Sequence, residues 1–120
     1  MTHVRRQEAQ DEKEDHEKLP EIYRESAKLF LEAGYPLKAS KYLKDAGLFE
    51  EAANMWAIQG QPDKAAPLYE RAGQYSKASK LYHHAGMYTE ATKSLHTGEL
   101  YEELVQYLEM CVTVFPQCNL

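Results

Sequence analysis

The stretch Ala72-Gly73-Gln74-Tyr75-Ser76-Lys77-Ala78 carries the pattern that decides the architecture of this chain, a glycine with an alanine five positions later. The pattern recurs at a constant interval, at Gly34, Gly47, Gly60, Gly73 and Gly86 with Ala39, Ala52, Ala65, Ala78 and Ala91. A fixed period is typical of tandem arrays in which one small structural unit is stacked repeatedly. The last glycine, Gly98, comes one position early.

Each unit has the apolar spacing of a helix. Three and four positions after the alanine come large apolar pairs, a spacing that favours helix over strand: Tyr42/Leu43, Met55/Trp56, Leu68/Tyr69 and Leu81/Tyr82, followed by Leu95 alone. Glycine readily adopts the left-handed conformation that ends a helix. The alanines suit positions where neighbouring helices approach closely.

Two consecutive units are expected to form one helical hairpin, so that the structural repeat is two units long. One unit, from a glycine to the next, holds a helix of about 9–10 residues, which is too short to be stable alone in water. Such helices must pack on their neighbours, as in a solenoid, and short turns make successive helices antiparallel. Pro36 and Pro62 are two units apart and each stands two positions after a glycine. This spacing supports the hairpin, because proline suits the first turn of a helix.

The fold class predicted from this pattern is an all-α solenoid of seven short antiparallel helices. Pro67 falls inside the fourth helix, where proline removes a hydrogen bond, so we expect that helix to start late, near Lys64, or to be kinked. The expected helices cover residues 20–32, 36–45, 49–58, 62–71, 75–84, 88–96 and 101–110.

Three segments are predicted along the chain: a charged, flexible segment over residues 1–18, a helical repeat domain over residues 19–110, and a tail over residues 111–120 that departs from the repeat. Residues 7–18 are almost wholly polar, which fits flexibility or a frayed, solvated helix. The apolar tail is unlike the polar cap of a solenoid. We favour the interpretation that the chain is a shortened product of a longer array; the alternative is that the tail folds back as an improvised cap.

The composition excludes several classes of protein. The net charge of −5 argues against nucleic-acid binding, which needs clustered Lys and Arg. No apolar run approaches the roughly 20 residues that cross a membrane, and the N-terminus lacks an apolar signal core. Cys111 and Cys118 fit a reducing compartment and match no zinc-binding spacing. We therefore predict an intracellular, cytoplasmic protein that does not insert into membranes.

Candidate chemical groups are few. His83, His84 and His96 are the candidate metal ligands, but adjacent residues point about 100° apart on a helix, so we expect surface histidines and no metal site. The glycines are spread one per unit as helix ends, so no phosphate-binding loop is present and no cofactor is expected.

Charged residues at the start of the helices are expected to be structural. The acidic pairs Glu50/Glu51 and Glu102/Glu103 stand where they complement the helix dipole. Catalysis by paired acids needs two carboxylates in one cleft, which nothing in the pattern indicates, so we predict no enzyme activity. The equivalent early-helix position of successive units has mixed charges, which predicts a solvated face with no basic stripe: Lys38, Glu51, Lys64, Lys77, Glu90 and Glu103.

The segment Gly73 to Tyr82 resembles the second half of a tetratricopeptide repeat, in which glycine, tyrosine, alanine and a paired aromatic residue recur at this spacing. The longer period and the tryptophan-leucine-glycine signature of that repeat are absent, so the resemblance is to the wider class of tetratricopeptide-like α-solenoids. The cadence of residues 65–78 is similar to the repeat arms of intraflagellar-transport, coatomer and clathrin-type subunits, and of helicase-like proteins with tetratricopeptide and ankyrin repeats. The resemblance covers residues 20–110 and implies a right-handed array that binds proteins without catalysis.

The predicted function is a non-catalytic protein-interaction module, or a segment of a larger scaffold, that presents a groove to a peptide or helix of a protein partner. The alternatives are an accessory segment of a large ATP-dependent helicase-like protein and a fragment of a vesicle-coat or ciliary-transport subunit. Open ends of the array could also self-associate. We interpret the paired aromatic residues first as core, and propose as a functional hypothesis that their edges line the groove: Tyr42, Trp56, Tyr69 and Tyr82.

Overall fold

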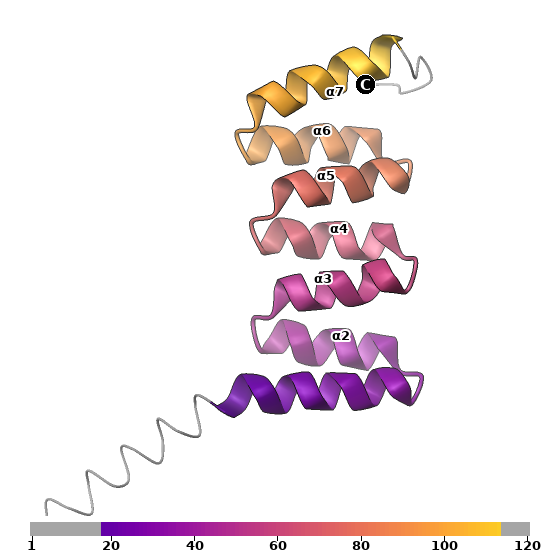
Figure 1. Ribbon diagram of the computed structural model, residues 1–120, viewed down its shortest axis with the longest axis vertical. Coiled ribbons are helices and arrows are strands. Elements are labelled where there is room, and N and C mark those ends of the chain that lie inside the picture. Colours follow the sequence, from indigo (N-terminus) through magenta and orange to yellow (C-terminus); the bar gives the residue numbers. More distant parts are fainter. Residues whose placement is uncertain (1–17, 114–120) are drawn as a thin grey trace, which may run out of the picture. The chain divides into compact units, whose positions relative to one another are not determined.

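The computed structural model describes residues 18–113, and every element in that part of the chain is a helix. The chain divides into two units, Met1–Leu48 and Phe49–Leu120. The first unit holds a helix whose described residues are 18–32 and α2 (Pro36–Asp45). The second holds α3 (Phe49–Ile58), α4 (Pro62–Arg71), α5 (Tyr75–His84), α6 (Tyr88–Thr97) and α7 (Tyr101–Thr113) (Figure 1). The predicted all-α solenoid is confirmed.

The periodic glycines end the helices as the sequence predicts. All five have a positive φ, from 73° at Gly60 to 87° at Gly34. After α4, the N–H of Gly73 donates to the carbonyl of Glu70 at 2.9 Å, and the N–H of Gln74 donates to the carbonyl of Tyr69 at 2.8 Å. These two bonds are the Schellman arrangement, which satisfies carbonyl groups that the helix leaves open at its C-terminus.

The turn between α6 and α7 reaches the same conformation with a different residue. Glu99 has a φ of 56° and occupies the turn position, while Gly98 is the C-cap of α6 with a φ of −78°. A Cβ atom on Gly98 would lie 2.6 Å from the Cβ of Tyr75 on α5. Glycine is therefore required at position 98 by the close approach of α5, and not by the turn.

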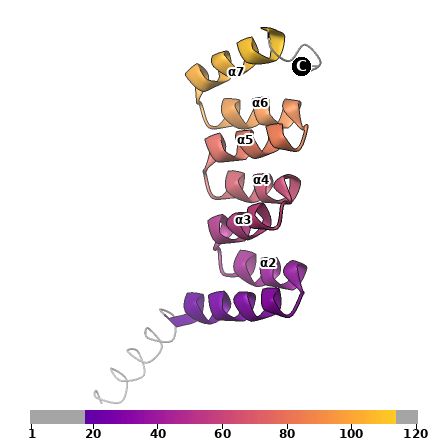
Figure 2. The same ribbon diagram turned by 45° about the vertical axis from the view of Figure 1, so that its right-hand side comes forward.

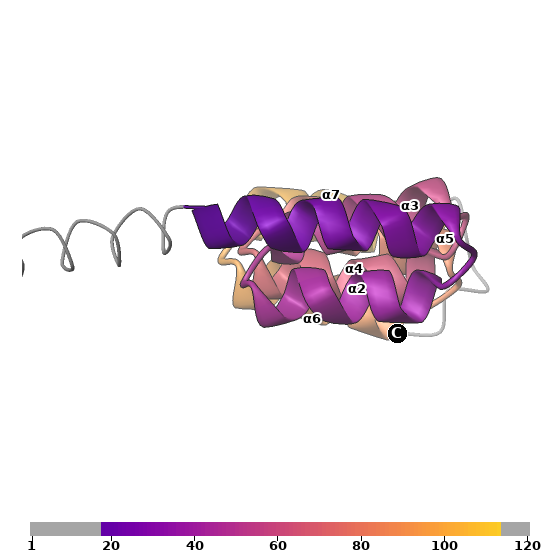
Figure 3. The ribbon, with the colours of Figure 1, turned by 90° about the horizontal axis from the view of Figure 1, so that it is seen from below.

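Successive helices in the second unit alternate between two layers. Figure 3 shows α3, α5 and α7 on one side and α4 and α6 on the other, and Figure 2 shows the same helices stacked in chain order. Neighbours in the chain pack against each other throughout this unit. The periodic alanines of both units have no exposed surface: Ala39, Ala52, Ala65, Ala78 and Ala91.

The first unit is held by an aromatic cluster. The ring of Tyr42 on α2 stacks on Phe30 with centroids 5.1 Å apart, and it contacts Tyr23 at 6.0 Å. Both partners lie on the helix over residues 18–32. Lys38 lies over the ring of Phe30 at 5.8 Å and over that of Tyr35 at 5.1 Å.

Three of the predicted helix bounds differ from the structure, in which Lys18 is already helical, and the expected late start of α4 is wrong. α6 ends at Thr97, one position later than expected, and α7 continues to Thr113, because no glycine or proline follows Met110 before Pro116. α4 begins at Pro62 and does not start late. Pro67 is exposed within α4, so the carbonyl that loses its helical partner can be solvated. The predictions for the flexible N-terminal segment and for most of the C-terminal tail concern residues 1–17 and 114–120, which lie outside the described residues.

Candidate functional site

Three of the four aromatic residues predicted to bind a partner are buried. Trp56, Tyr69 and Tyr82 have exposed fractions of 5%, 6% and 5%, whereas Tyr42 is 37% exposed. The first three therefore belong to the core of the second unit. Tyr42 presents an edge to solvent, although its ring packs within the aromatic cluster of the first unit. The burial of these three residues agrees with the interpretation of the paired aromatic residues as core. A binding role for any of the four stays a prediction.

The hydroxyl groups of the buried tyrosines join neighbouring helices. Tyr69 on α4 donates a hydrogen bond to the side-chain oxygen of Asn54 on α3, and Tyr82 on α5 donates to the carboxylate of Glu70 on α4. Burial raises the pKa of Tyr82, and the hydrogen bond to Glu70 and the negative charges of Glu70 and Glu90 raise it further. The tyrosine hydroxyls thus add specific polar contacts to an apolar interface.

Sequence reasoning missed a regular cation–π contact. Lys64 lies over the ring of Trp56 at 4.6 Å, and Lys77 lies over the ring of Tyr69 at 5.7 Å. Each lysine stands eight positions after its aromatic partner, as Lys38 does after Phe30 in the first unit. The signal was present in the sequence at the position interpreted only as a solvated face.

Whether this position carries a lysine or a glutamate correlates with the type of residue eight positions earlier. The glutamates Glu51 and Glu103 stand eight positions after Leu43 and Leu95, which have no ring for a cation to cover. Glu90 is the exception, because it stands eight positions after Tyr82. Lysine at this position therefore stabilises the packing of an aromatic residue, in addition to being solvated.

Polar side chains also connect helices of one layer. Lys77 on α5 pairs with Glu50 on α3 at 3.4 Å, and the hydroxyl of Ser76 on α5 donates to Glu103 on α7 at 2.8 Å. Both pairs stand at the first turns of their helices. Glu50 and Glu103, which the sequence suggested as acidic pairs with Glu51 and Glu102, thus bind neighbouring helices and do not converge on one cleft.

A groove of about 290 Å³ lies between α5 and α7, with α6 at its base. His83 on α5 crosses it, with its Nδ1 3.0 Å from the hydroxyl of Tyr107 on α7 and the two rings edge to face. Ser76 and Glu103 meet at its other end. It is lined by Ser76, Ser79, Lys80, His83, His84, Leu95, Glu103, Gln106, Tyr107 and Met110.

The outer face of α7 is an exposed apolar strip, which we define as Tyr101, Val105 and Val112. Their exposed fractions are 55%, 53% and 76%. Spacings of four and seven positions place the three side chains on one side of the helix. At about 100° per residue, the groove-lining residues Glu103 and Met110 face the other side.

The histidines are placed among aromatic rings. His83 contacts Tyr88 at 5.2 Å between centroids, and His96 contacts Tyr101 at 6.2 Å. Among residues 18–113, no group of three or more His, Cys, Asp or Glu is arranged to hold a metal ion. In the same part of the chain, no helix combines the length and apolar character needed to cross a membrane. Cys111 is a free, buried thiol.

Comparison with known proteins supplies a family for this helical array. A family model described as "SNAP: Soluble NSF attachment protein, SNAP" matches residues 29–119. No curated protein and no solved structure matches the chain. The matched range includes every helix from α2 to α7 and most of the sequence. The chain therefore belongs to the soluble NSF attachment protein (SNAP) family.

Proposed function

We propose that this chain is a non-catalytic protein-interaction module that attaches to NSF, the partner named in the description of its family. Membership of a family of helical scaffolds supports a protein partner. The observation that carries the proposal is the apolar strip on α7. In the described part of the second unit, the large apolar side chains that are exposed are those of the strip and Ile58 on α3.

The strip has the chemistry of a helix-binding surface. Its three side chains follow the spacing by which one helix packs along another. Exposed apolar rows of this kind, with charged neighbours such as Glu102 and Glu109, resemble the apolar centre and polar rim of protein interfaces. We infer that a helix of NSF covers the strip as the next helix of an array would.

Binding of purified NSF to the purified chain tests this proposal. We expect Val105→Lys and Val112→Lys each to weaken the affinity about tenfold, because placing an ammonium group in an apolar interface costs on the order of 1–2 kcal/mol. Ile58→Lys is the matched control, since Ile58 is 83% exposed, is also β-branched and lies in the same unit. Circular dichroism should show equal helix content in all three variants.

Two outcomes would count against the proposal. If the wild-type chain does not bind NSF, the partner is wrong. If it binds and all three variants bind equally well, the strip is not the contact surface. A loss of affinity with Ile58→Lys as large as that with Val105→Lys would show that added positive charge, and not the strip, explains the effect.

Five more specific predictions from the sequence stay predictions. These are the accessory role in a helicase-like protein, the coat or ciliary-transport fragment, self-association through the ends, the absence of nucleic-acid binding and the cytoplasmic location. A phosphate-binding loop in a longer form of the gene product would favour the first, and assembly into a megadalton complex would favour the second. The family match favours neither over attachment to NSF.

A further inference from the structure

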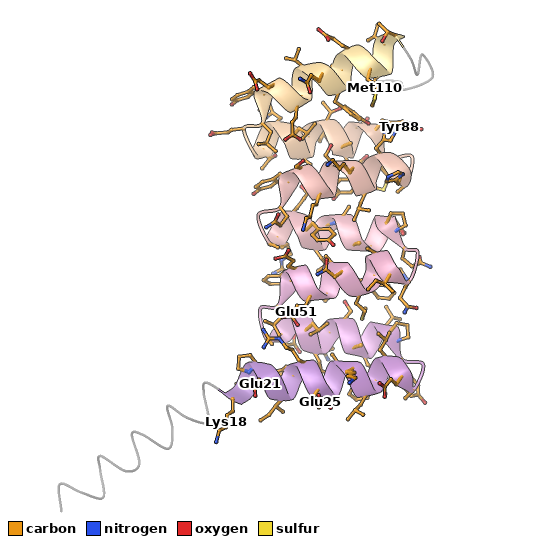
Figure 4. The ribbon with its side chains drawn as sticks, viewed as in Figure 1. Lys18, Glu21, Glu25, Glu51, Tyr88 and Met110 are labelled. Carbon is orange, nitrogen blue, oxygen red and sulfur yellow. The ribbon has the colours of Figure 1, made fainter. Side chains whose placement is uncertain are left out.

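The groove between α5 and α7 is a gap in an otherwise closely packed unit. α6 and α7 pack less closely than the earlier pairs of neighbouring helices do. Leu95 of α6, which is 3% exposed, lines the groove from its base, and Met110 lies on the side of α7 that faces α6 (Figure 4). These two apolar side chains border a space that no described residue fills. The lining therefore favours an apolar group as the occupant.

The size of the groove restricts this occupant to a small one. Its volume of about 290 Å³ lies at the low end of the roughly 300–1,000 Å³ that is typical of small-molecule sites. A helix with its side chains has a diameter of about 10 Å and is too wide. The lining side chains follow α5 from Ser76 to His84, a rise of about 12 Å, so the groove is elongated. This shape suits a short aliphatic chain better than a compact ring system.

The charged groups of the groove are separated along its length. At one end, the carboxylate of Glu103 accepts a hydrogen bond from Ser76 at 2.8 Å. Lys80 and His84 stand four and eight positions after Ser76, so they lie on the same side of α5 toward the other end. Within the described part of the chain, Lys80 forms no ion pair. The charge that is left without an opposite charge in the wall of the groove is therefore an ammonium group.

Other hydrogen-bond donors stand near this ammonium group in the lining. Gln106 of α7 lies in the opposite wall and is exposed, and its side-chain amide has two N–H groups to donate. Ser79, which is 4% exposed, adds a hydroxyl group next to Lys80 in the sequence. Ammonium, amide and hydroxyl groups all donate hydrogen bonds to a carboxylate. The groove thus combines an apolar lining with donors that suit an anion.

We propose that this groove binds a small amphipathic carboxylate, such as the anion of a medium-chain fatty acid, with its carboxylate at Lys80 and its aliphatic chain against Leu95 and Met110. Burial of the chain supplies most of the affinity, and Lys80 selects the sign of the charge. A ligand with an ammonium group would instead have to draw Glu103 away from Ser76, which breaks an existing hydrogen bond. Because the groove and the strip lie on opposite sides of α7, this site does not depend on attachment to NSF.

Titration of the full chain with octanoate, below the concentration at which it forms micelles, tests the proposal. The methyl NMR signals of Leu95 and Met110, which line the groove, should shift and reach saturation. Those of Val105 and Val112 on the strip should stay in place. Octylamine has the same chain and the opposite charge, and it should bind about tenfold more weakly. The absence of a saturable shift, an equal shift on the strip, or equal binding of octylamine would overturn the proposal.

Lys80→Gln and Lys93→Gln are a matched pair of variants. Each removes one exposed ammonium group, but only Lys80 lines the groove. We expect Lys80→Gln to weaken octanoate binding about fivefold and to leave octylamine binding unchanged or stronger, whereas Lys93→Gln should change neither. If both variants bind octanoate as tightly as the wild type does, Lys80 does not recognise the carboxylate and the proposal is wrong.

Two other occupants are distinguished by the same methyl signals. If the signals of Leu95 and Met110 depend on protein concentration before octanoate is added, a second copy of the chain fills the groove. If a tetrapeptide that ends in leucine with a free carboxylate binds more tightly than octanoate, the ligand is the terminus of a protein chain. Either result would overturn the assignment of the groove to a small free acid.

Discussion

In the turn between α6 and α7 the glycine comes first, at Gly98, and Glu99 follows it with a positive φ, whereas in each earlier turn a different residue precedes the glycine that has the positive φ. The early position of Gly98 was visible in the sequence, but its cause was not, because the cause is the side chain of Tyr75 on another helix. Sequence periodicity shows where a turn must lie. It does not show which residue of the turn is crowded by a neighbouring helix.

Substitutions at these two positions should therefore differ in their effect on stability. Gly98→Ala should lower the free energy of unfolding by about 1–3 kcal/mol, since the new Cβ would overlap Tyr75. Glu99→Gly should leave it unchanged or raise it by up to about 1 kcal/mol, because glycine accepts the positive φ without strain. Urea denaturation followed by circular dichroism measures both. A loss of stability in Glu99→Gly that matched the loss in Gly98→Ala would contradict this account.

The contact between Lys64 and Trp56 is a second feature of single residues that the sequence contained. Lys64→Met keeps most of the aliphatic stem and removes the charge, so we expect a loss of about 0.5–1 kcal/mol in the free energy of unfolding. Lys93→Met on the exposed face of α6 is the control and should change little. Equal effects of the two substitutions in urea denaturation would show that the ring contact is not stabilising.

The raised pKa of Tyr82 predicts a dependence of stability on alkaline pH. The folded chain keeps the Tyr82 proton above pH 10.0, where the unfolded chain releases it, so the free energy of unfolding should fall as the pH rises above about 10. Below that pH the contribution of the group is constant. Tyr82→Phe should show a shallower fall between pH 9 and 11 in urea denaturation, and Tyr101→Phe, at an exposed site, should follow the wild type. A slope unchanged by Tyr82→Phe would refute the prediction.

At the scale of elements, helix positions followed closely from the glycine period, and the exceptions have local causes. α7 extends past its predicted end because no glycine or proline follows Met110 before Pro116. α4 keeps its predicted start despite Pro67, because the proline faces solvent. Neither the groove nor the strip was predicted, since both depend on how closely α7 packs on its neighbours, which periodicity does not report.

Pro67 offers a direct test of this explanation. Pro67→Ala should restore the helical hydrogen bond to the carbonyl of Asp63 and raise the free energy of unfolding by about 1–3 kcal/mol. The gain is reduced by the greater freedom of the unfolded chain. Hydrogen exchange should then show a protected amide at position 67, where proline has none, and unchanged protection in α6. No gain in stability would mean that α4 already compensates for the missing bond.

At the scale of the whole molecule, the class of fold was accessible from sequence, whereas the family was not. The glycine period describes how helices stack, and many unrelated arrays stack in this way. Three of the residues predicted to bind a partner are buried for the same reason: Trp56, Tyr69 and Tyr82 repeat because the core repeats. The strip that we propose as an interaction surface departs from the repeat, and it lies on α7, where the repeat changes.

The alternation of α3, α5 and α7 with α4 and α6 gives the array a parity. Removal of two units between equivalent turns takes one helix from each layer and leaves every later helix on its original side. Removal of a single unit transfers all later helices to the opposite layer, so that side chains which shared a face no longer do. A surface built on one layer can therefore change in length only by even numbers of units.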